Sequence, residues 1–145
     1  MKPIPLNYEA HFELMVTEGM TVDFEQTDPR LGKLHSVYST YWMVKHMELA
    51  SRKLLLPFLD DGEEGIGFEV SAKHFASALP GMRVAVTAVH TGTKKNRVYA
   101  QCEAVSELGD KLGQGETTQV IMSRNKLEQG FTELRTRWQM LREKG

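Results

Sequence analysis

Three side chains of different chemical types stand where they could move protons: a threonine, a carboxylate and a histidine. The threonine, Thr40, lies at the beginning of an apolar segment that we expect to be helical. Free backbone N–H groups at a helix start stabilise negative charge, so a hydroxyl there could attack a carbonyl, or orient a carbonyl or a water molecule. A simple helix cap is the more frequent role for such a residue, and the sequence alone favours it.

Glu48 follows Thr40 by eight residues, roughly 12 Å along an ideal helix axis and about 80° around it. Both side chains could line one cleft, especially if a second chain closes it. Glu48 stands between Met47 and Leu49, and burial there would raise its pKa and make it a base at neutral pH. An ordinary ion pair with Arg52, one helical turn further on, explains Glu48 about equally well.

His74 shares one face of a predicted strand with Phe68 and Val70. Imidazole titrates near neutral pH, so His74 could activate a nucleophile or protonate a leaving group. A structural histidine in a core or at a sheet edge is the more frequent case. The other histidines show no regular metal-ligand spacing, so we expect no metal site and interpret them as structural or exposed. They are His11, His35, His46 and His90.

The elements that must position these groups follow from hydrophobic periodicity. Apolar residues recur at helical spacing from residue 40 to about residue 56 and spread over most sides of that helix, which is typical of a buried helix. Ser39 or Thr40 can cap its start, and Pro57 ends it. The preceding polar stretch, Phe24 to Ser36, is predicted to be a long loop that covers a site.

The rest of the chain alternates between strand patterns and turn residues. The predicted strands are residues 11–17, 66–74, 82–90, 97–105 and 111–123, after an extended leader over residues 1–9. A final helix over 125–144 carries apolar residues four and three apart. We expect it to dock on the domain, with a short coiled-coil contact to a partner as the alternative.

Short turns between consecutive strands favour an antiparallel meander, and a helix too apolar to face water must lie against it. The predicted fold class is therefore α+β. A long central helix wrapped by a curved antiparallel sheet is the hotdog arrangement, here as one domain over residues 1–145. Such domains usually pair through their sheets, so we expect a homodimer or a larger homo-oligomer.

Composition excludes several classes of function. The net charge of −1 argues against a general nucleic-acid binder. No stretch approaches the roughly 20 apolar residues of a membrane span, and the first residues lack the apolar run of a signal peptide. The single cysteine, Cys102, excludes an intrachain disulfide and is expected to be a small buried hydrophobe. These features favour a cytoplasmic protein.

An ordered set of residues resembles a known family. It comprises Val37-Tyr38-Ser39-Thr40, then Glu48, Gly65 and Gly67, then His74, and finally Pro80-Gly81-Met82-Arg83-Val84. From about Phe24 to Leu127 the chain is similar to the fluoroacetyl-CoA thioesterase branch of the hotdog superfamily.

The resemblance implies thioester hydrolysis by Thr40, Glu48 and His74, with Gly67 supporting the thioester through its backbone. It also implies an acyl-CoA or similar thioester as the partner molecule, a dimer, no metal, and no cofactor apart from the CoA of the substrate.

Other residues bear on substrate binding. Leu31 and Leu34 occupy lid positions where the compared family member has phenylalanines, and Gln119 replaces a basic residue late in the last strand. Both departures put a fluoroacetyl substrate in doubt more than they affect the hydrolytic chemistry. Tyr38 could help to shape a small acyl pocket. Lys94 and Lys95 form the turn most suited to CoA phosphates, although a solvated turn is at least as common.

Two other readings of the same residues stay open. A non-catalytic acyl-CoA or acyl-carrier binding module would use the same groove without turnover. A hotdog hydratase or dehydratase also uses a histidine and a carboxylate, but the chain shows no characteristic hydratase segment.

Overall fold

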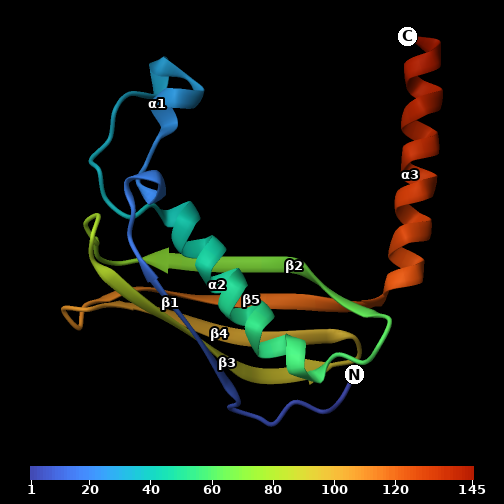
Figure 1. The fold of residues 1–145 in the computed structure, drawn as a ribbon, viewed down its shortest axis with the longest axis horizontal. Coiled ribbons are helices and arrows are strands. Elements are labelled where there is room, and N and C mark those ends of the chain that lie inside the picture. The colour runs from blue at the N-terminus through green and yellow to red at the C-terminus, as the bar shows by residue number, and fades with distance from the viewer.

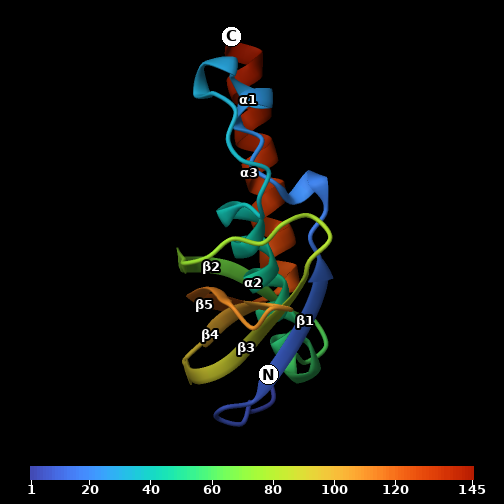
Figure 2. The same cartoon turned by 90° about the vertical axis from the view of Figure 1, so that its left-hand side faces the viewer.

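The structure is a computed structural model that describes all 145 residues. Five antiparallel strands form one sheet in the order β1-β3-β4-β5-β2, and the sheet curls around the central helix α2 (Figures 1 and 2). This confirms the predicted α+β hotdog fold. The elements are β1 (Glu9–Met15), η1 (Glu18–Met20), α1 (Phe24–Thr27), η2 (Pro29–Leu31), α2 (Thr40–Leu55), η3 (Leu56–Phe58), β2 (Glu63–His74), β3 (Arg83–Lys94), β4 (Arg97–Ser106), β5 (Lys111–Ser123) and α3 (Arg124–Lys144).

Helix α2 forms the centre of the core, as its apolar periodicity predicts. The side chains of Met43, Met47 and Leu54 are fully buried. The sheet accommodates the helix closely at Gly113 on β5, where an added Cβ would lie 2.6 Å from the sulfur of Met43 and 2.5 Å from the carbonyl oxygen of Lys73. A side chain at that position would collide with the β2 backbone and with the end of the Met43 side chain, so glycine allows β2, β5 and α2 to pack closely here.

The region before α2 is more ordered than the predicted loop. Residues 18–36, which we call the lid segment, contain η1, α1 and η2. Asp28 caps η2 by accepting from the Arg30 N–H at 3.0 Å. In Figure 1 the lid segment projects past the β2 edge of the sheet.

Strand β2 departs from simple alternation. A β-bulge between Gly67 and Glu69 shifts its register against β5. After the bulge, Val70 and His74 point toward α2, whereas Phe68 is 56% exposed and stacks under Arg97 at 4.4 Å. The expectation that Phe68 shares the inward face is wrong, because an extra residue inverts the side-chain phase of a strand.

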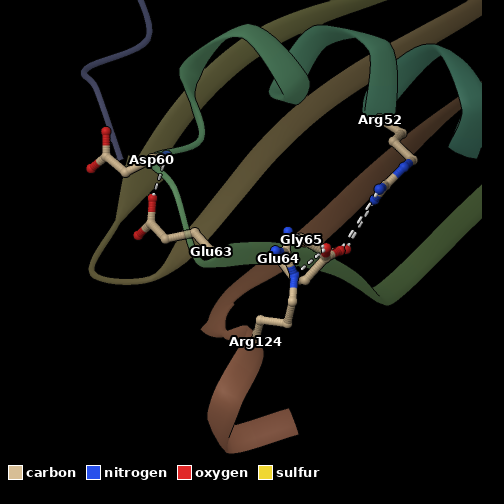
Figure 3. A network of polar contacts seen from close by, with 6 residues as sticks. All are labelled: Arg52, Asp60, Glu63, Glu64, Gly65 and Arg124. Atoms are coloured by element: carbon tan, nitrogen blue, oxygen red, sulfur yellow. Dashed lines mark hydrogen bonds and ion pairs between the residues drawn. The ribbon is translucent and has the colours of Figure 1, made fainter. Parts of the chain in front are cut away.

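The expectation that helix α3 docks on the domain is wrong. None of its residues is buried, and it projects away from the domain instead of docking on it (Figures 1 and 2). A polar network fixes only its base: Arg124 contacts Glu64 on β2 at 3.1 Å, while Arg52 of α2 donates to the Gly65 carbonyl at 3.2 Å (Figure 3). No helix of the chain combines the length and the hydropathy that crossing a membrane would require.

Candidate active site

The first turn of α2 lies beside the last residue of β2, and this brings Thr40 and His74 together. Thr40 Oγ1 is 2.8 Å from His74 Nδ1. Capping of α2 falls to Ser39, whose hydroxyl oxygen accepts from the Trp42 N–H at 3.2 Å. The cap interpretation of Thr40 is therefore wrong, and its hydroxyl is available for the contact with His74.

A pocket of about 300 Å³ surrounds this pair. Its walls include Val22 from the lid segment and Phe75 from the loop after β2. The backbone N–H groups of Thr40 and Tyr41 make no hydrogen bond within the chain. A carbonyl oxygen in the pocket would therefore find N–H donors at a helix N-terminus, which stabilise a developing oxyanion.

The surroundings of His74 suit a proton acceptor. Burial lowers the pKa of its imidazole, although the backbone of Ala76 opposes this effect. The ring is therefore neutral at pH 7 and can accept a proton. Its Nε2 is buried and has no hydrogen-bond partner. In the tautomer in which Nδ1 accepts from Thr40, Nε2 carries the ring proton.

A second, fully buried layer supports His74. The Tyr38 ring packs edge-on against the His74 ring, with centroids 6.3 Å apart, and its hydroxyl lies 2.5 Å from His46 Nδ1. Burial, with a smaller contribution from Lys45, lowers the pKa of His46 to about 4, and burial raises that of the Tyr38 hydroxyl. Tyr38 therefore contributes its ring to the pocket, while its polar atom faces His46.

Glu48 lies apart from this pair within one chain. It lines a second pocket of about 230 Å³ between α2 and β2, which Gly67 and Gln119 also line. The Glu48 side chain is exposed, so its expected burial is wrong. The alternative ion pair with Arg52 is wrong too: Arg52 approaches Glu64 at 3.8 Å instead (Figure 3). Glu48 makes no ion pair.

The other residues predicted to bind substrate lie in different parts of the molecule. The amide of Gln119 is buried and donates to the Ser51 carbonyl at 2.9 Å, which fixes it at the inner end of the Glu48 pocket. Leu31 and Leu34 are exposed in the lid segment. Lys94 and Lys95 lie at the β3–β4 turn, where Lys95 adopts a positive φ of 56°.

Sequence reasoning missed the supporting role of His46 and the wall residues Val22 and Phe75. The sequence indicates only that His46 is structural or exposed, whereas in the structure it is buried, with 3% of its surface exposed. Its helical spacing from the buried Met43 and Ala50 could have placed it on the inward face of α2. Val22 and Phe75 carry no comparable signal, because only the fold brings them beside Thr40.

Comparisons with known proteins identify the fold and the family of the chain. A thioesterase superfamily member from Thermus thermophilus, described as a hypothetical protein, is 59% identical; the match covers 97% of this chain and 99% of that chain, with a TM-score of 0.91. The structure of the fluoroacetyl-CoA thioesterase FlK matches with a TM-score of 0.83 at 22% identity, over 91% of this chain and 98% of that one. These matches define the class: a hotdog thioesterase, as the sequence predicted.

The particular family follows from the sequence profile described as "fluoroacetyl-CoA-specific thioesterase", which matches residues 16–125. The chain belongs to this family, whose chemistry is thioester hydrolysis. The fluoroacetyl-CoA thioesterase of Streptantibioticus cattleyicolor is 28% identical over 94 residues, or 65% of this chain and 67% of that protein. The resemblance seen in the sequence is confirmed.

Proposed function

We propose that this chain hydrolyses an acyl-CoA-type thioester to a carboxylic acid and free thiol, as a homodimer and without a metal or a cofactor beyond the CoA of its substrate. The observation that carries the proposal is the 2.8 Å contact between Thr40 Oγ1 and His74 Nδ1 in a pocket of a thioesterase-family chain. The free and buried Cys102 agrees with a reducing compartment, and we assign the enzyme to the cytoplasm.

The chemistry follows from the atoms around the pocket. The thioester carbonyl would point its oxygen at the N–H groups that begin α2, and neutral His74 would take a proton from Thr40 or from a water molecule that Thr40 orients. The attacking oxygen forms a bond to the carbonyl carbon, and collapse of the tetrahedral intermediate breaks the carbon–sulfur bond while the imidazolium returns its proton to the leaving thiolate. If Thr40 is the attacking group, a water molecule then hydrolyses the Thr40 ester and restores the hydroxyl. Water supplies the oxygen of the carboxylic acid.

Glu48 enters the proposal as a second proton acceptor or nucleophile further along the same α2–β2 groove. Within one chain it belongs to a different pocket from Thr40 and His74. Strand β2 pairs only with β5, so its outer edge is free for another chain. A second β2 along that edge would cover the groove and give Glu48 the partly desolvated surroundings that a carboxylate base needs.

The test is release of free thiol from short, medium and aryl acyl-CoAs. We expect turnover on at least one substrate, with kcat reduced about 10²- to 10⁴-fold in His74→Ala, Thr40→Val and Glu48→Gln. The matched controls are His11→Ala on the outside of β1 and Glu143→Gln at the end of α3, and both should retain activity.

Circular dichroism checks the fold of each variant, and size-exclusion chromatography checks the dimer. Saturable binding of CoA thioesters without turnover would contradict the hydrolase and support the binding module. Full activity in Glu48→Gln would remove Glu48 from the chemistry.

A further inference from the structure

Helix α3 carries an apolar stripe that the chain itself leaves uncovered. The stripe consists of Leu127, Phe131, Leu134, Trp138 and Leu141, spaced four and three residues apart. Phe131, Leu134 and Trp138 are each 56–57% exposed. Contiguous exposed apolar side chains on an otherwise charged helix are typical of an interaction surface.

The position of α3 relative to β2 indicates what covers the stripe. The Arg124 N–H, the first of α3, donates to the Gly62 carbonyl just before β2 at 2.8 Å, and the Arg124 guanidinium contacts Glu64. His74 ends the same strand. Helix α3 and the Thr40–His74 pocket therefore lie at opposite ends of β2, and Figure 1 shows α3 projecting past the free edge of that strand.

Pairing of two chains through this edge brings those opposite ends together. The step rests on the homodimer of the proposed function, with β2 antiparallel to β2 of the second copy. Such a pair has a two-fold axis perpendicular to the sheet, so the start of one β2 lies beside the end of the other. Helix α3 of one protomer then rises next to the loop that follows His74 in its partner, while the two α3 helices lie apart.

The surface at that end fits an apolar helix. The β2–β3 loop (residues 75–82) contains no charged residue, and Phe75 and Leu79 are 53% and 52% exposed. At the base of α3, Leu127, Phe131 and Leu134 line a groove of about 360 Å³, and Gly130 keeps it open because no side chain fills that position.

We propose that the apolar stripe of α3 docks on the β2–β3 loop of a second copy of this chain. Phe75 also lines the pocket that holds Thr40 and His74. Helix α3 of one protomer thereby becomes the outer wall of the catalytic pocket of the other, and each pocket is complete only in the dimer.

Cysteine cross-linking tests this contact directly, because the one native cysteine is buried. Leu79→Cys is combined with Phe131→Cys or with Leu134→Cys, and the dimer is treated with a short bifunctional maleimide. We expect a covalent dimer on denaturing gels from at least one double variant. A control pair, Leu79→Cys with Leu6→Cys in the leader, should stay monomeric on the gel.

The alternatives give different outcomes. Covalent dimers from Phe131→Cys or Leu134→Cys alone would show α3 pairing with α3 and would overturn the proposal. No cross-link in an active dimer would overturn it too and leave the proposed function intact. A wild-type protein that is monomeric yet active would remove both the dimer and this contact.

Measurements of dimerisation and of KM test whether α3 forms a wall of the partner's pocket or only contacts the partner. Phe131→Ser combined with Trp138→Ser should weaken dimerisation at least tenfold and raise KM for the acyl-CoA more than it lowers kcat at saturating protein. Gln129→Ser with Gln139→Ser, off the stripe, should change neither quantity. Unchanged dimerisation and KM in the stripe variant would overturn the proposal.

Discussion

The two long helices share one kind of sequence pattern but differ in what covers it. In α2 the residues at helical spacing, Met43, Met47 and Leu54, are fully buried against the sheet. In α3 no residue is buried, and its stripe faces solvent in the single chain. Periodicity therefore identifies an apolar face and leaves open whether the same chain or another one covers it.

The threonine hydroxyls of the two helices also differ in their hydrogen-bond partners. On α3, Thr132 and Thr136 donate to the backbone carbonyls four residues earlier at 3.0 and 3.1 Å. On α2, Thr40 turns its hydroxyl to His74 because Ser39 already caps the helix. The hydroxyl of a threonine in a helix usually bonds to the helix's own backbone, so the contact of the Thr40 hydroxyl with a histidine of β2 sets it apart from the two threonines of α3.

The largest expected difference between the two helices is in the free energy of unfolding lost when one leucine of each helix is replaced by alanine. Leu54→Ala should lower the free energy of unfolding by about 3 kcal/mol, since it leaves a cavity beneath the sheet. Leu141→Ala, at the 69% exposed tip of α3, should cost less than about 0.5 kcal/mol. Urea denaturation measures both. Equal losses in the two variants would contradict the division between a covered and an uncovered helix.

The fold was largely predictable, because each element carries its own local signal. The observed strands and both long helices begin and end close to their predicted residues, and the hotdog arrangement follows from burying α2 on an antiparallel sheet. Two features carry no local signal in the sequence. The bulge at Phe68 depends on how β2 pairs with β5, and the apolar stripe of α3 does not say whether this chain covers it.

The candidate site was predictable in part. Thr40 and His74, 34 residues apart, do meet, and the family resemblance selected them. Glu48 was expected to be buried because its neighbours in sequence are apolar. On a helix, however, adjacent residues point about 100° apart, so the burial of Met47 does not extend to Glu48. Roles for all three stay predictions until the variants are measured.

Lowering the pH should destabilise the fold through His46, which is buried on α2. The pKa of His46 is about 4 in the fold against 6.5 when unperturbed, so the unfolded chain binds more protons between these values. The stabilisation is complete above pH 6.5 and declines as the pH falls toward 4. From pH 7 to 4.5 the loss should be roughly 2 kcal/mol.

Urea midpoints at the two pH values measure this loss, and His46→Gln is the matched variant. It should be less stable at pH 7, since Tyr38 loses its partner, but it should lose less stability on acidification than the wild type. An equal pH dependence in both proteins would show that other groups dominate acid unfolding.

The smallest expected difference between the two helices is in the unfolding free energy contributed by their serine N-caps, Ser39 and Ser123. Ser39 accepts from the Trp42 N–H at 3.2 Å and is 1% exposed, whereas Ser123 accepts from the Lys126 N–H at 3.4 Å at an exposed helix start. Water can replace the second hydroxyl but not the first. Ser39→Ala should therefore cost about 1 kcal/mol of unfolding free energy, and Ser123→Ala a few tenths. If Ser123→Ala costs as much as Ser39→Ala, the base of α3 must be shielded from water, which in this fold only a second chain pressed against the start of β2 can achieve.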